Sequence, residues 1–182
     1  MAAGMKRLPG DPAADEIVRR MIRVDHAGEY GAARIYAGQL AVLGRSQAAP
    51  AIRRMAEQEE RHLAAFDKLV VERRVRPTAL SPLWHVAGWA LGAATAVLGE
   101  RAAMACTVAV ETVIDEHYAG QIAQLGTSEP ALAASLEEFR QNEIEHRDTA
   151  LSQGAEEAPA YELLSAAIKA GSRLAIWLST RV

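Results

Sequence analysis

Cysteine is nearly absent from this sequence, since Cys106 is the only one among 182 residues. A single thiol excludes an internal disulfide framework and is typical of a protein in a reducing compartment. Aromatic residues make up only 5% of the chain, and β-branched residues do not gather into alternating runs. Residues that favour helix, such as Ala, Leu, Glu, Arg and Gln, dominate instead. The composition therefore predicts an all-α protein.

Signals for nucleic-acid or nucleotide binding are also missing. The net charge is -3, so the chain has no bulk basic field that would attract nucleic acid. Zinc-finger spacing, a phosphate-binding loop and a dinucleotide glycine fingerprint do not occur in the sequence. We therefore expect no nucleic-acid partner and no classical nucleotide-binding fold.

The amino-terminal stretch, MAAGMKRLPGDPAADE, lacks the apolar core of a secretory signal. Residues 1–10 are expected to form a flexible leader. Asp11 as N-cap and Pro12 at the first helical position then begin a single domain over residues 11–182. Glycine and proline residues that interrupt helices divide this domain into segments. The expected helices span about residues 11–43, 50–75, 83–99, 100–125, 128–153 and 159–179.

The segment 83–99, LWHVAGWALGAATAVLG, carries no formal charge over 17 residues. A helix that spans a membrane needs about 20 apolar residues, so this segment is short for that purpose. Three alternatives remain: a buried helix of a soluble bundle, a transmembrane span, or a helix lying in a membrane interface. In the last case Trp84 and Trp89 would lie at the level of the lipid headgroups.

The motif E-x-x-H occurs twice, at Glu59–His62 and again 84 residues later at Glu143–His146. Each copy lies on the second arm of a predicted antiparallel helical hairpin. In such a hairpin, residues at equal distances from the turn lie at the same height. With the first turn near residue 44, position 29 therefore lies beside Glu59. With the second turn near residue 127, position 111 lies beside Glu143. Both reflected positions are glutamates. The chain therefore looks like a duplicated hairpin, with repeats over about 11–76 and 100–154.

Buried carboxylates must be paired or bind a metal, because an isolated buried charge is expensive. Four converging glutamates would be neutralised by two divalent cations. Oxygen and imidazole donors with open positions suit iron or manganese better than structural zinc. The pattern is that of a ferritin-like four-helix bundle, in which two helices each give one Glu and the other two give Glu-x-x-His. The predicted ligands are Glu29, Glu59, His62, Glu111, Glu143 and His146.

Nearly the whole chain after residue 15 closely resembles the demethoxyubiquinone hydroxylases of ubiquinone biosynthesis. The resemblance is carried by RVDHAGEYGAARIYAGQ (23–39), EQEERHLAAF (57–66), ACTVAVETVIDEHYAGQI (105–122), NEIEHRDTAL (142–151) and APAYELLSAAIKAGSRLAIWLS (158–179). It implies a ferritin-like di-iron monooxygenase that uses O2 to hydroxylate the ring of a polyprenylated demethoxy-quinone or quinol. It also implies two Fe ions per chain held by the six residues above, with Glu59 and Glu143 as the candidate bridges.

The resemblance further implies a peripheral membrane protein, here on the cytoplasmic face of a bacterial inner membrane. The apolar helix 83–99 would lie in the membrane interface and would provide an apolar entry path for a prenyl tail. Other ubiquinone-biosynthesis proteins and further copies of the chain are candidate partners.

Three residues near the first-arm glutamates are candidates for orienting ligands or moving protons: His26, His117 and Tyr118. The alternative is that they are partly exposed polar residues. Tyr30 and Tyr36 are interpreted as packing residues, and Cys106 as a core residue.

The last helix carries a basic stripe with one tryptophan, because Lys169, Arg173, Trp177 and Arg181 recur at every fourth position. The stripe is either a solvated face or a surface for anions. Candidate anions are lipid headgroups and a reduced nicotinamide dinucleotide such as NADH. Arg20 and Arg23, near the start of the first ligand helix, could extend the stripe.

Two further functions compete with the hydroxylase. One is an iron-storage or ferroxidase bundle, although an uncharged 17-residue stretch argues against a soluble cage. The other is a non-catalytic scaffold that holds a lipid quinone for other pathway enzymes. Turnover that depends on the ligand residues would separate the enzyme from both.

Overall fold

The computed structural model describes residues 13–182, so the expected leader and the Asp11–Pro12 helix start lie outside the described residues. The described part contains six α-helices, one short 3-10 turn and no strand, as an all-α prediction requires. The elements are α1 (Ala14–Leu43), α2 (Ala49–Glu72), α3 (Ser81–Val97), α4 (Glu100–Leu125), α5 (Pro130–Ser152), η1 (Ala155–Glu157) and α6 (Tyr161–Ser179).

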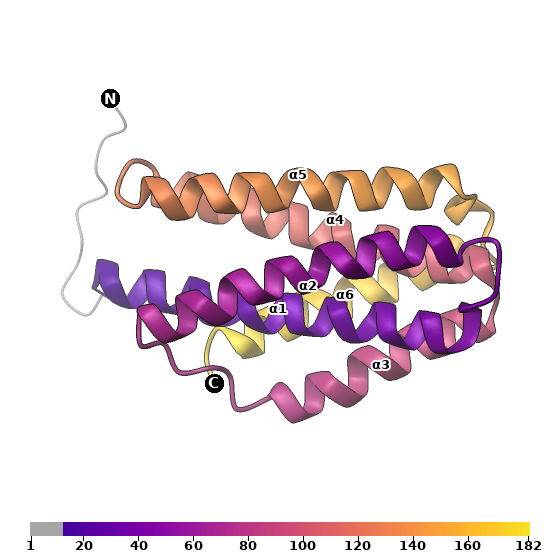
Figure 1. Ribbon diagram of the computed structural model, residues 1–182, viewed down its shortest axis with the longest axis horizontal. Coiled ribbons are helices and arrows are strands. Elements are labelled where there is room, and N and C mark those ends of the chain that lie inside the picture. Colours follow the sequence, from indigo (N-terminus) through magenta and orange to yellow (C-terminus); the bar gives the residue numbers. More distant parts are fainter. Residues whose placement is uncertain (1–12) are drawn as a thin grey trace.

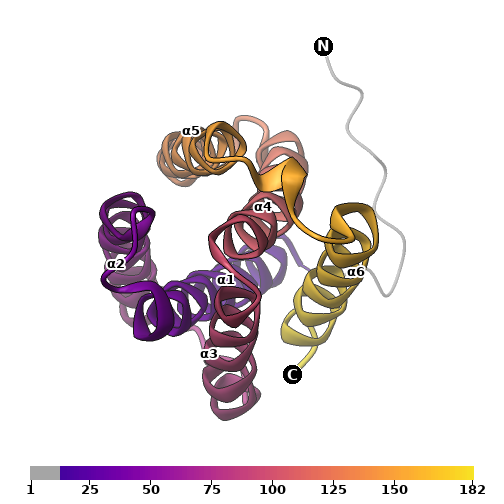
Figure 2. The same ribbon diagram turned by 90° about the vertical axis from the view of Figure 1, so that its right-hand side faces the viewer.

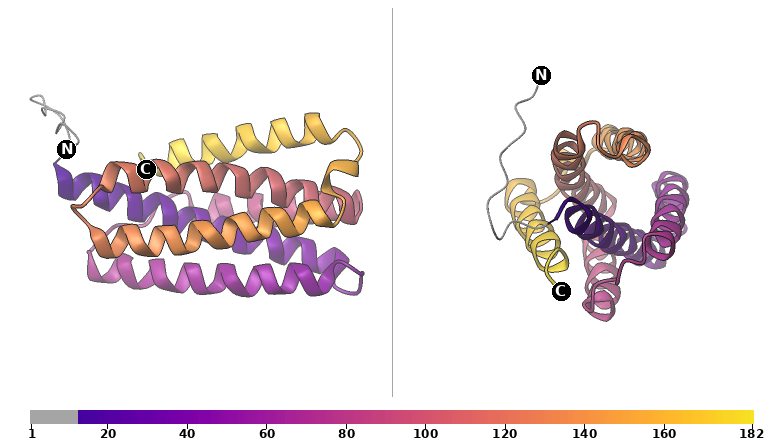
Figure 3. Two further views of the ribbon diagram at one scale, coloured as in Figure 1. Left: turned by 90° about the horizontal axis from the view of Figure 1, so that it is seen from above. Right: turned by 90° about the vertical axis from the view of Figure 1, so that its left-hand side faces the viewer.

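Two antiparallel hairpins, α1–α2 and α4–α5, form a four-helix bundle (Figure 1). Seen along its axis, α1 and α4 lie in the middle, α2 and α5 lie on one side, and α3 and α6 lie on the other (Figure 2). The end of α6 and the start of α1 lie at the same end of the bundle (Figure 3). This architecture is that of a ferritin-like bundle with two added helices. Cys106 is fully buried in it, as predicted.

The second helix ends at Glu72, three residues before the expected position, and the reason is a Schellman motif. Arg74 adopts a left-handed conformation, with φ of 50°. The backbone N–H of Val75 then donates to the carbonyl of Val70, and that of Arg74 donates to the carbonyl of Val71. Because Val75 is buried, the motif tucks its side chain into the core instead of continuing the helix.

Left-handed residues also set the later helix boundaries. Gly126, with φ of 54°, ends α4 at the expected place, and α5 begins at Pro130, two residues later than expected. Gly154, with φ of 80°, follows the end of α5. Ala160, with φ of 52°, delays the start of α6 to Tyr161, whereas the sequence pattern predicted a start near residue 159.

The third helix packs along α1 at a distance that only glycine permits. A methyl group at Gly38 would overlap the backbone of α3, and one at Gly92 would overlap the backbone of α1. Tyr30 also joins these two helices, because its hydroxyl lies 2.6 Å from Nδ1 of His85. The packing prediction for Tyr30 therefore missed a hydrogen bond between α1 and α3.

Most of α3 is nevertheless exposed, and only Gly92, Thr95 and Ala96 are buried in it. Leu83 and Val86 are 52% and 64% exposed. A buried helix of a soluble bundle, the first alternative for this segment, is therefore wrong. Among residues 13–182 no helix combines the length and apolar character needed to cross a membrane.

Candidate metal centre

Six ionisable side chains meet in the middle of the bundle, and each is at most 2% exposed. The first arms of the hairpins, α1 and α4, give one glutamate each. The second arms, α2 and α5, give a glutamate and a histidine three residues later, which places both on one face of the helix. The six are Glu29, Glu59, His62, Glu111, Glu143 and His146.

The six side chains form two overlapping groups, within each of which the ligand atoms lie within 4.8 Å of one another. Glu29 and His62 belong to one group, and Glu111 and His146 belong to the other. Glu59 and Glu143 belong to both groups. This is the arrangement that two neighbouring metal ions with shared carboxylates require.

Eight oxygen and nitrogen atoms of these residues are buried and lack a hydrogen-bond partner. Nδ1 of His62 lies 3.1 Å from Oε1 of Glu143, and Nδ1 of His146 lies 3.1 Å from Oε1 of Glu59. Buried polar atoms in folded proteins are normally satisfied. So many inward-facing donor atoms without partners fit a metal site, and the mixed oxygen and nitrogen set suits ions such as iron.

Burial and mutual repulsion hold the glutamates in an unusual protonation state when no cation balances them. Burial raises the pKa of Glu59 and Glu111 well above its ordinary value, and the charge of Glu143 raises both further. Burial also raises the pKa of Glu143, although the neighbouring imidazole of His62, with Nδ1 at 3.1 Å, opposes this. Without a cation, protons on these carboxyl groups therefore reduce the negative charge that a metal ion would otherwise balance.

The two histidines respond differently to this environment. Burial disfavours the charged form of His62, but the adjacent carboxylates of Glu143 and Glu29 outweigh burial and raise its pKa to about 10. Burial dominates at His146 and lowers its pKa. The metal-free group thus balances part of its negative charge with a proton on His62.

A tyrosine hydroxyl contacts each first-arm glutamate. Tyr118 donates to Glu29, which agrees with its predicted orienting position. Tyr36 donates to Oε1 of Glu111 at 2.6 Å and is 1% exposed. Tyr36 does pack in the hydrophobic core, as interpreted, but that interpretation missed its hydrogen bond to Glu111.

A sequence signal for both tyrosines was available. The tetrapeptide YAGQ occurs at 36–39 and again at 118–121, and each copy begins seven residues after a first-arm glutamate. The two copies are 82 residues apart, which is also the separation of Glu29 and Glu111.

Neither of the other two candidates touches the group directly. Nε2 of His117 lies 3.1 Å from Oδ1 of Asp25, and the amide of Gln121 donates to the same oxygen at 2.7 Å. Burial raises the pKa of Asp25. His26 lies 2.9 Å from the carboxylate of Asp67, an exposed residue of α2.

A cavity of about 350 Å³ lies between the central helices and the pair α3 and α6, and its walls are mostly apolar. Gly28 and Val110, which precede Glu29 and Glu111 in the sequence, line it. A methyl group placed on Gly28 would meet no atom within 4 Å, so this glycine leaves space. A hydrogen bond of 2.9 Å from Trp84 to Ser179 joins α3 to α6 at the cavity wall.

Arg173, Trp177 and Arg181 of the basic stripe lie toward or just beyond the carboxyl end of α6, whereas Arg20 lies on α1, and several of these residues have partners. Arg173 forms an ion pair with Glu116 at 2.9 Å, and Arg20 pairs with Glu16 at 3.0 Å. The guanidinium of Arg181 lies 4.1 Å from the ring centre of Trp177.

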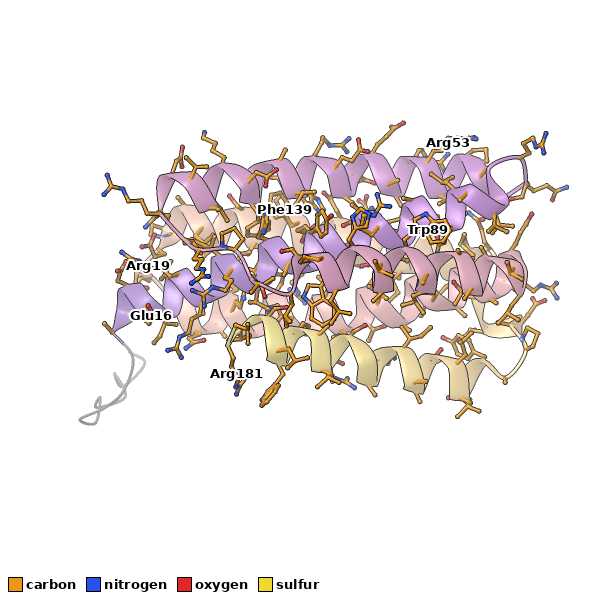
Figure 4. The ribbon with its side chains drawn as sticks, turned by 90° about the horizontal axis from the view of Figure 1, so that it is seen from below. Glu16, Arg19, Arg53, Trp89, Phe139 and Arg181 are labelled. Atoms are coloured by element: carbon orange, nitrogen blue, oxygen red, sulfur yellow. The ribbon has the colours of Figure 1, made fainter. Side chains whose placement is uncertain are left out.

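Arg181 extends away from the bundle at the end of α6 (Figure 4). It also lines a smaller cavity of about 290 Å³ together with two further arginines, Arg23 and Arg76. Three arginines therefore line one pocket where the end of α6 approaches α1.

A helical bundle in which four helices bring Glu and Glu-x-x-His together defines the class of ferritin-like proteins with a carboxylate-rich metal centre. Residues 16–179 match the family model described as "Ubiquinone biosynthesis protein COQ7". The chain belongs to this family.

Curated relatives cover most of the chain. A protein of Rhodospirillum rubrum named 3-demethoxyubiquinol 3-hydroxylase is 60% identical over 177 residues, which is 97% of this chain and 84% of that protein. A human protein named NADPH-dependent 3-demethoxyubiquinone 3-hydroxylase, mitochondrial, is 55% identical over 91% of this chain and 78% of its own length. A Saccharomyces cerevisiae protein named 5-demethoxyubiquinone hydroxylase, mitochondrial, is 42% identical over 90% of this chain and 77% of its own length.

Proposed function

We propose that this protein is a di-iron monooxygenase that hydroxylates the ring of a polyprenylated demethoxy-ubiquinone or quinol in ubiquinone biosynthesis. The observation that carries the proposal is the double group of buried carboxylates and imidazoles beside an apolar cavity. Relatives that bear hydroxylase names support the substrate class, because they align over nine-tenths of the chain.

The six residues of the group would hold two iron ions, with Glu59 and Glu143 in reach of both. Bound iron would supply the redox change that lets dioxygen react with an electron-rich ring. The protein's own contribution is positional: Tyr36 and Tyr118 hold Glu111 and Glu29 by hydrogen bonds, and the buried surroundings exclude water.

The apolar cavity is the proposed site for the substrate's hydrocarbon. Its size lies within the range typical of small-molecule pockets. Because residues next to Glu29 and Glu111 line its wall, a ring at its inner end would lie close to the metal group. Gly28 and Gly31 have no side chains, and the space beside them is the room that a prenyl chain needs.

The exposed faces of α3 and α6 are proposed to rest on a membrane. Leu83 and Val86 on α3, and Leu174 and Trp177 on α6, are each more than half exposed. Both helices also line the apolar cavity, so a lipid quinone could pass from the bilayer into it. We place the protein on the cytoplasmic face of a bacterial inner membrane, where its partners would include other ubiquinone-biosynthesis proteins and further copies of the chain.

The reductant is proposed to be a reduced nicotinamide dinucleotide, bound at the surface near the end of α6. Arg173, Trp177 and Arg181 of the stripe, with Arg20 as its candidate extension on α1, supply guanidinium groups and a ring, which are the groups that phosphates and a nicotinamide would contact. Anionic headgroups compete for the same chemistry. NADH is the candidate from the sequence, and the mammalian relatives are named as NADPH-dependent.

Turnover of the purified protein tests the function. The protein would be loaded with ferrous iron and incubated with a demethoxy-quinone, reductant and oxygen, and the hydroxylated ring measured by mass spectrometry. We expect Glu143→Ala to lower the rate at least about 100-fold, since even residues behind the ligands cost 10- to 100-fold in such centres. Glu145→Ala is the matched control, because Glu145 lies two residues away and is exposed.

Two results would overturn the hydroxylase. Equal turnover by the two variants would favour a scaffold whose metal group is structural. A wild type that mineralises iron inside a many-subunit shell, without turnover, would favour storage.

A further inference from the structure

The outward-facing nitrogens of the two central histidines each meet a carboxamide. Nε2 of His62 lies 3.1 Å from Oδ1 of Asn142, and Nε2 of His146 lies 3.0 Å from Oε1 of Gln58. A carboxamide oxygen only accepts hydrogen bonds, so each Nε2 must carry the ring proton. Nδ1 of His146, which faces the carboxylates, is then left with the lone pair that a metal ion needs, and Nδ1 of His62 gains the same lone pair once its second proton leaves.

The two carboxamides occupy the same position in the two motifs. Gln58 immediately precedes Glu59, and Asn142 immediately precedes Glu143. Each serves the histidine of the other hairpin: the amide on α2 contacts the histidine on α5, and the amide on α5 contacts the histidine on α2. Neither hairpin therefore orients its own imidazole.

The tyrosine contacts show the same exchange. Tyr36 on α1 donates to Glu111 on α4, and Tyr118 on α4 donates to Glu29 on α1. All four supporting contacts thus cross from one hairpin to the other. Because they repeat at equivalent positions of both hairpins, they form a twofold pattern rather than four unrelated bonds.

We propose that Gln58 and Asn142 are positioning residues that fix the tautomer and orientation of His146 and His62 for metal binding through Nδ1. This inference rests on the proposed metal centre. An aromatic ring assists at His62, since the ring of Phe139 lies 4.3 Å from the imidazole centre and limits its rotation. Figure 4 shows Phe139 between the helices, in the interior of the bundle.

The neutral character of the two acceptors has a consequence for the metal. A carboxylate behind a histidine makes the imidazole a stronger donor and favours the more highly charged, oxidised metal. A carboxamide fixes the same tautomer without adding negative charge to a group that already has four carboxylates. With iron bound, Gln58 and Asn142 would therefore keep its reduced state within reach of a biological reductant.

The tautomer can be measured without any metal. Nitrogen-15 NMR of metal-free protein is expected to show His146 with its proton on Nε2 and none on Nδ1. Gln58→Leu keeps the side-chain bulk but removes the acceptor, so we expect a mixture of tautomers or faster ring motion. A proton on Nδ1 of His146 in the wild type would overturn the inference.

Metal binding provides the second measurement. Anaerobic titration with ferrous or cobaltous ion is expected to fill two sites in the wild type, and Asn142→Leu should weaken at least one of them by about 10- to 100-fold. Gln141→Leu is the matched control, because Gln141 is an exposed amide on the same helix that contacts Glu137. Asn142→Asp should retain both ions, and the reduction potential of its iron pair should fall.

The outcomes separate this inference from the proposed function. A wild type that binds fewer than two ions contradicts both. A wild type that binds two ions, together with Asn142→Leu and Asn142→Asp that match it in affinity and potential, contradicts only the positioning role. Circular dichroism of each metal-free variant checks the fold, and Asn142→Asp still tests the inference if the leucine variant fails to fold.

Discussion

At the scale of single residues, the centre is a concentration of charge that the fold alone does not balance. Glu59, Glu111 and Glu143 are buried beside one another, and burial raises the pKa of each carboxyl. A group of this kind binds protons when metal is absent and releases them when metal enters. Stability, metal affinity and pH are therefore linked through the same few atoms.

This linkage predicts that the metal-free protein loses stability as pH rises. The three carboxyls and His62 have higher pKa values in the folded protein than in the unfolded chain, so the folded state holds more protons. Their stabilising contribution is complete below the unfolded pKa values and is lost as pH rises through the folded ones. His146, with a lowered pKa, gives no slope above about pH 7 because it is neutral in both states there.

Thermal unfolding between about pH 7 and pH 9 checks the sign. We expect the melting temperature of metal-depleted protein to fall across this range, while that of the iron-loaded protein changes much less. The stabilisation that metal provides should accordingly grow with pH. A metal-free melting temperature that rises over the same range would contradict the shared-proton account.

The sequence predicted the residues of the centre better than it predicted their supports. Glu29 and Glu111 could be found because hairpin geometry is local, and reflection through a short turn needs only residue counting. Tyr36 was missed because a lone tyrosine in an amphipathic helix is usually a packing residue. Its contact with Glu111 joins residues 75 positions apart. Only the repeated YAGQ could have pointed to it.

At the scale of elements, the contact between α1 and α3 determines where the apolar helix lies. Gly38 and Gly92 let the two backbones approach so closely that α3 is fixed to the bundle while most of its side chains stay outside. Burial of backbone against backbone thus holds a helix whose own apolar residues contribute little to the core. The position of α3 in turn defines one wall of the cavity.

The two YAGQ copies give a matched test of this contact. Gly38→Ala is expected to destabilise the protein by about 1–3 kcal/mol, because the new methyl group has no room against α3. Gly120→Ala changes the equivalent residue of α4, where a methyl group meets no atom within 4 Å and the position is exposed. That change should be neutral or stabilising by up to about 1 kcal/mol.

Chemical denaturation of both variants measures the difference. Equal stability of Gly38→Ala and the wild type would show that α3 does not depend on this close approach. Binding of an apolar dye in the cavity is a second measurement. Equal dye binding by both variants would show that the shape of the cavity does not depend on the close packing of α3.

Helix ends show where the sequence pattern was insufficient. The pattern continued α2 to Val75, because nothing in the local composition forbids helix there. The chain instead stops at Glu72, since burying Val75 in the core requires Arg74 to turn left-handed. Where such a helix ends depends on the core residues that its last side chains contact. Hydrophobic periodicity along one helix does not contain that information.

At the scale of the whole molecule, the bundle has two unlike sides. Helices α2 and α5 lie on one side of it, and α3 and α6 lie on the other (Figure 2). The first side supplies the two Glu-x-x-His motifs of the candidate metal group, and the second carries the cavity and most of the exposed large apolar residues. The central helices α1 and α4 contribute to both, with glutamates on one face and cavity walls on the other. The same two helices therefore connect the cavity to the candidate metal group, because Gly28 and Val110 in the cavity wall are next to Glu29 and Glu111 in the sequence.

If α3 rests on a membrane, removing its outward apolar side chains should weaken attachment without disturbing the fold. Leu83 and Val86 are 52% and 64% exposed, so their replacement by serine removes little core packing. Each loss should cost roughly 1 kcal/mol of transfer free energy, and the double variant should bind vesicles about tenfold more weakly or worse. Val71→Ser is the matched control, because Val71 is 76% exposed but lies on α2, which does not line the apolar cavity.

Co-sedimentation with vesicles of zwitterionic and of anionic lipid measures this attachment. A loss confined to the Leu83→Ser/Val86→Ser variant, seen with both lipids, assigns the contact to apolar insertion of α3. If binding depends only on whether the lipid is anionic, and not on the serine substitutions, the contact would be assigned to the arginines near the end of α6. Equal binding by all variants, with unchanged access of a long-chain quinone to the cavity, would contradict a membrane-resting α3, because entry through that face requires the helix to lie against the bilayer.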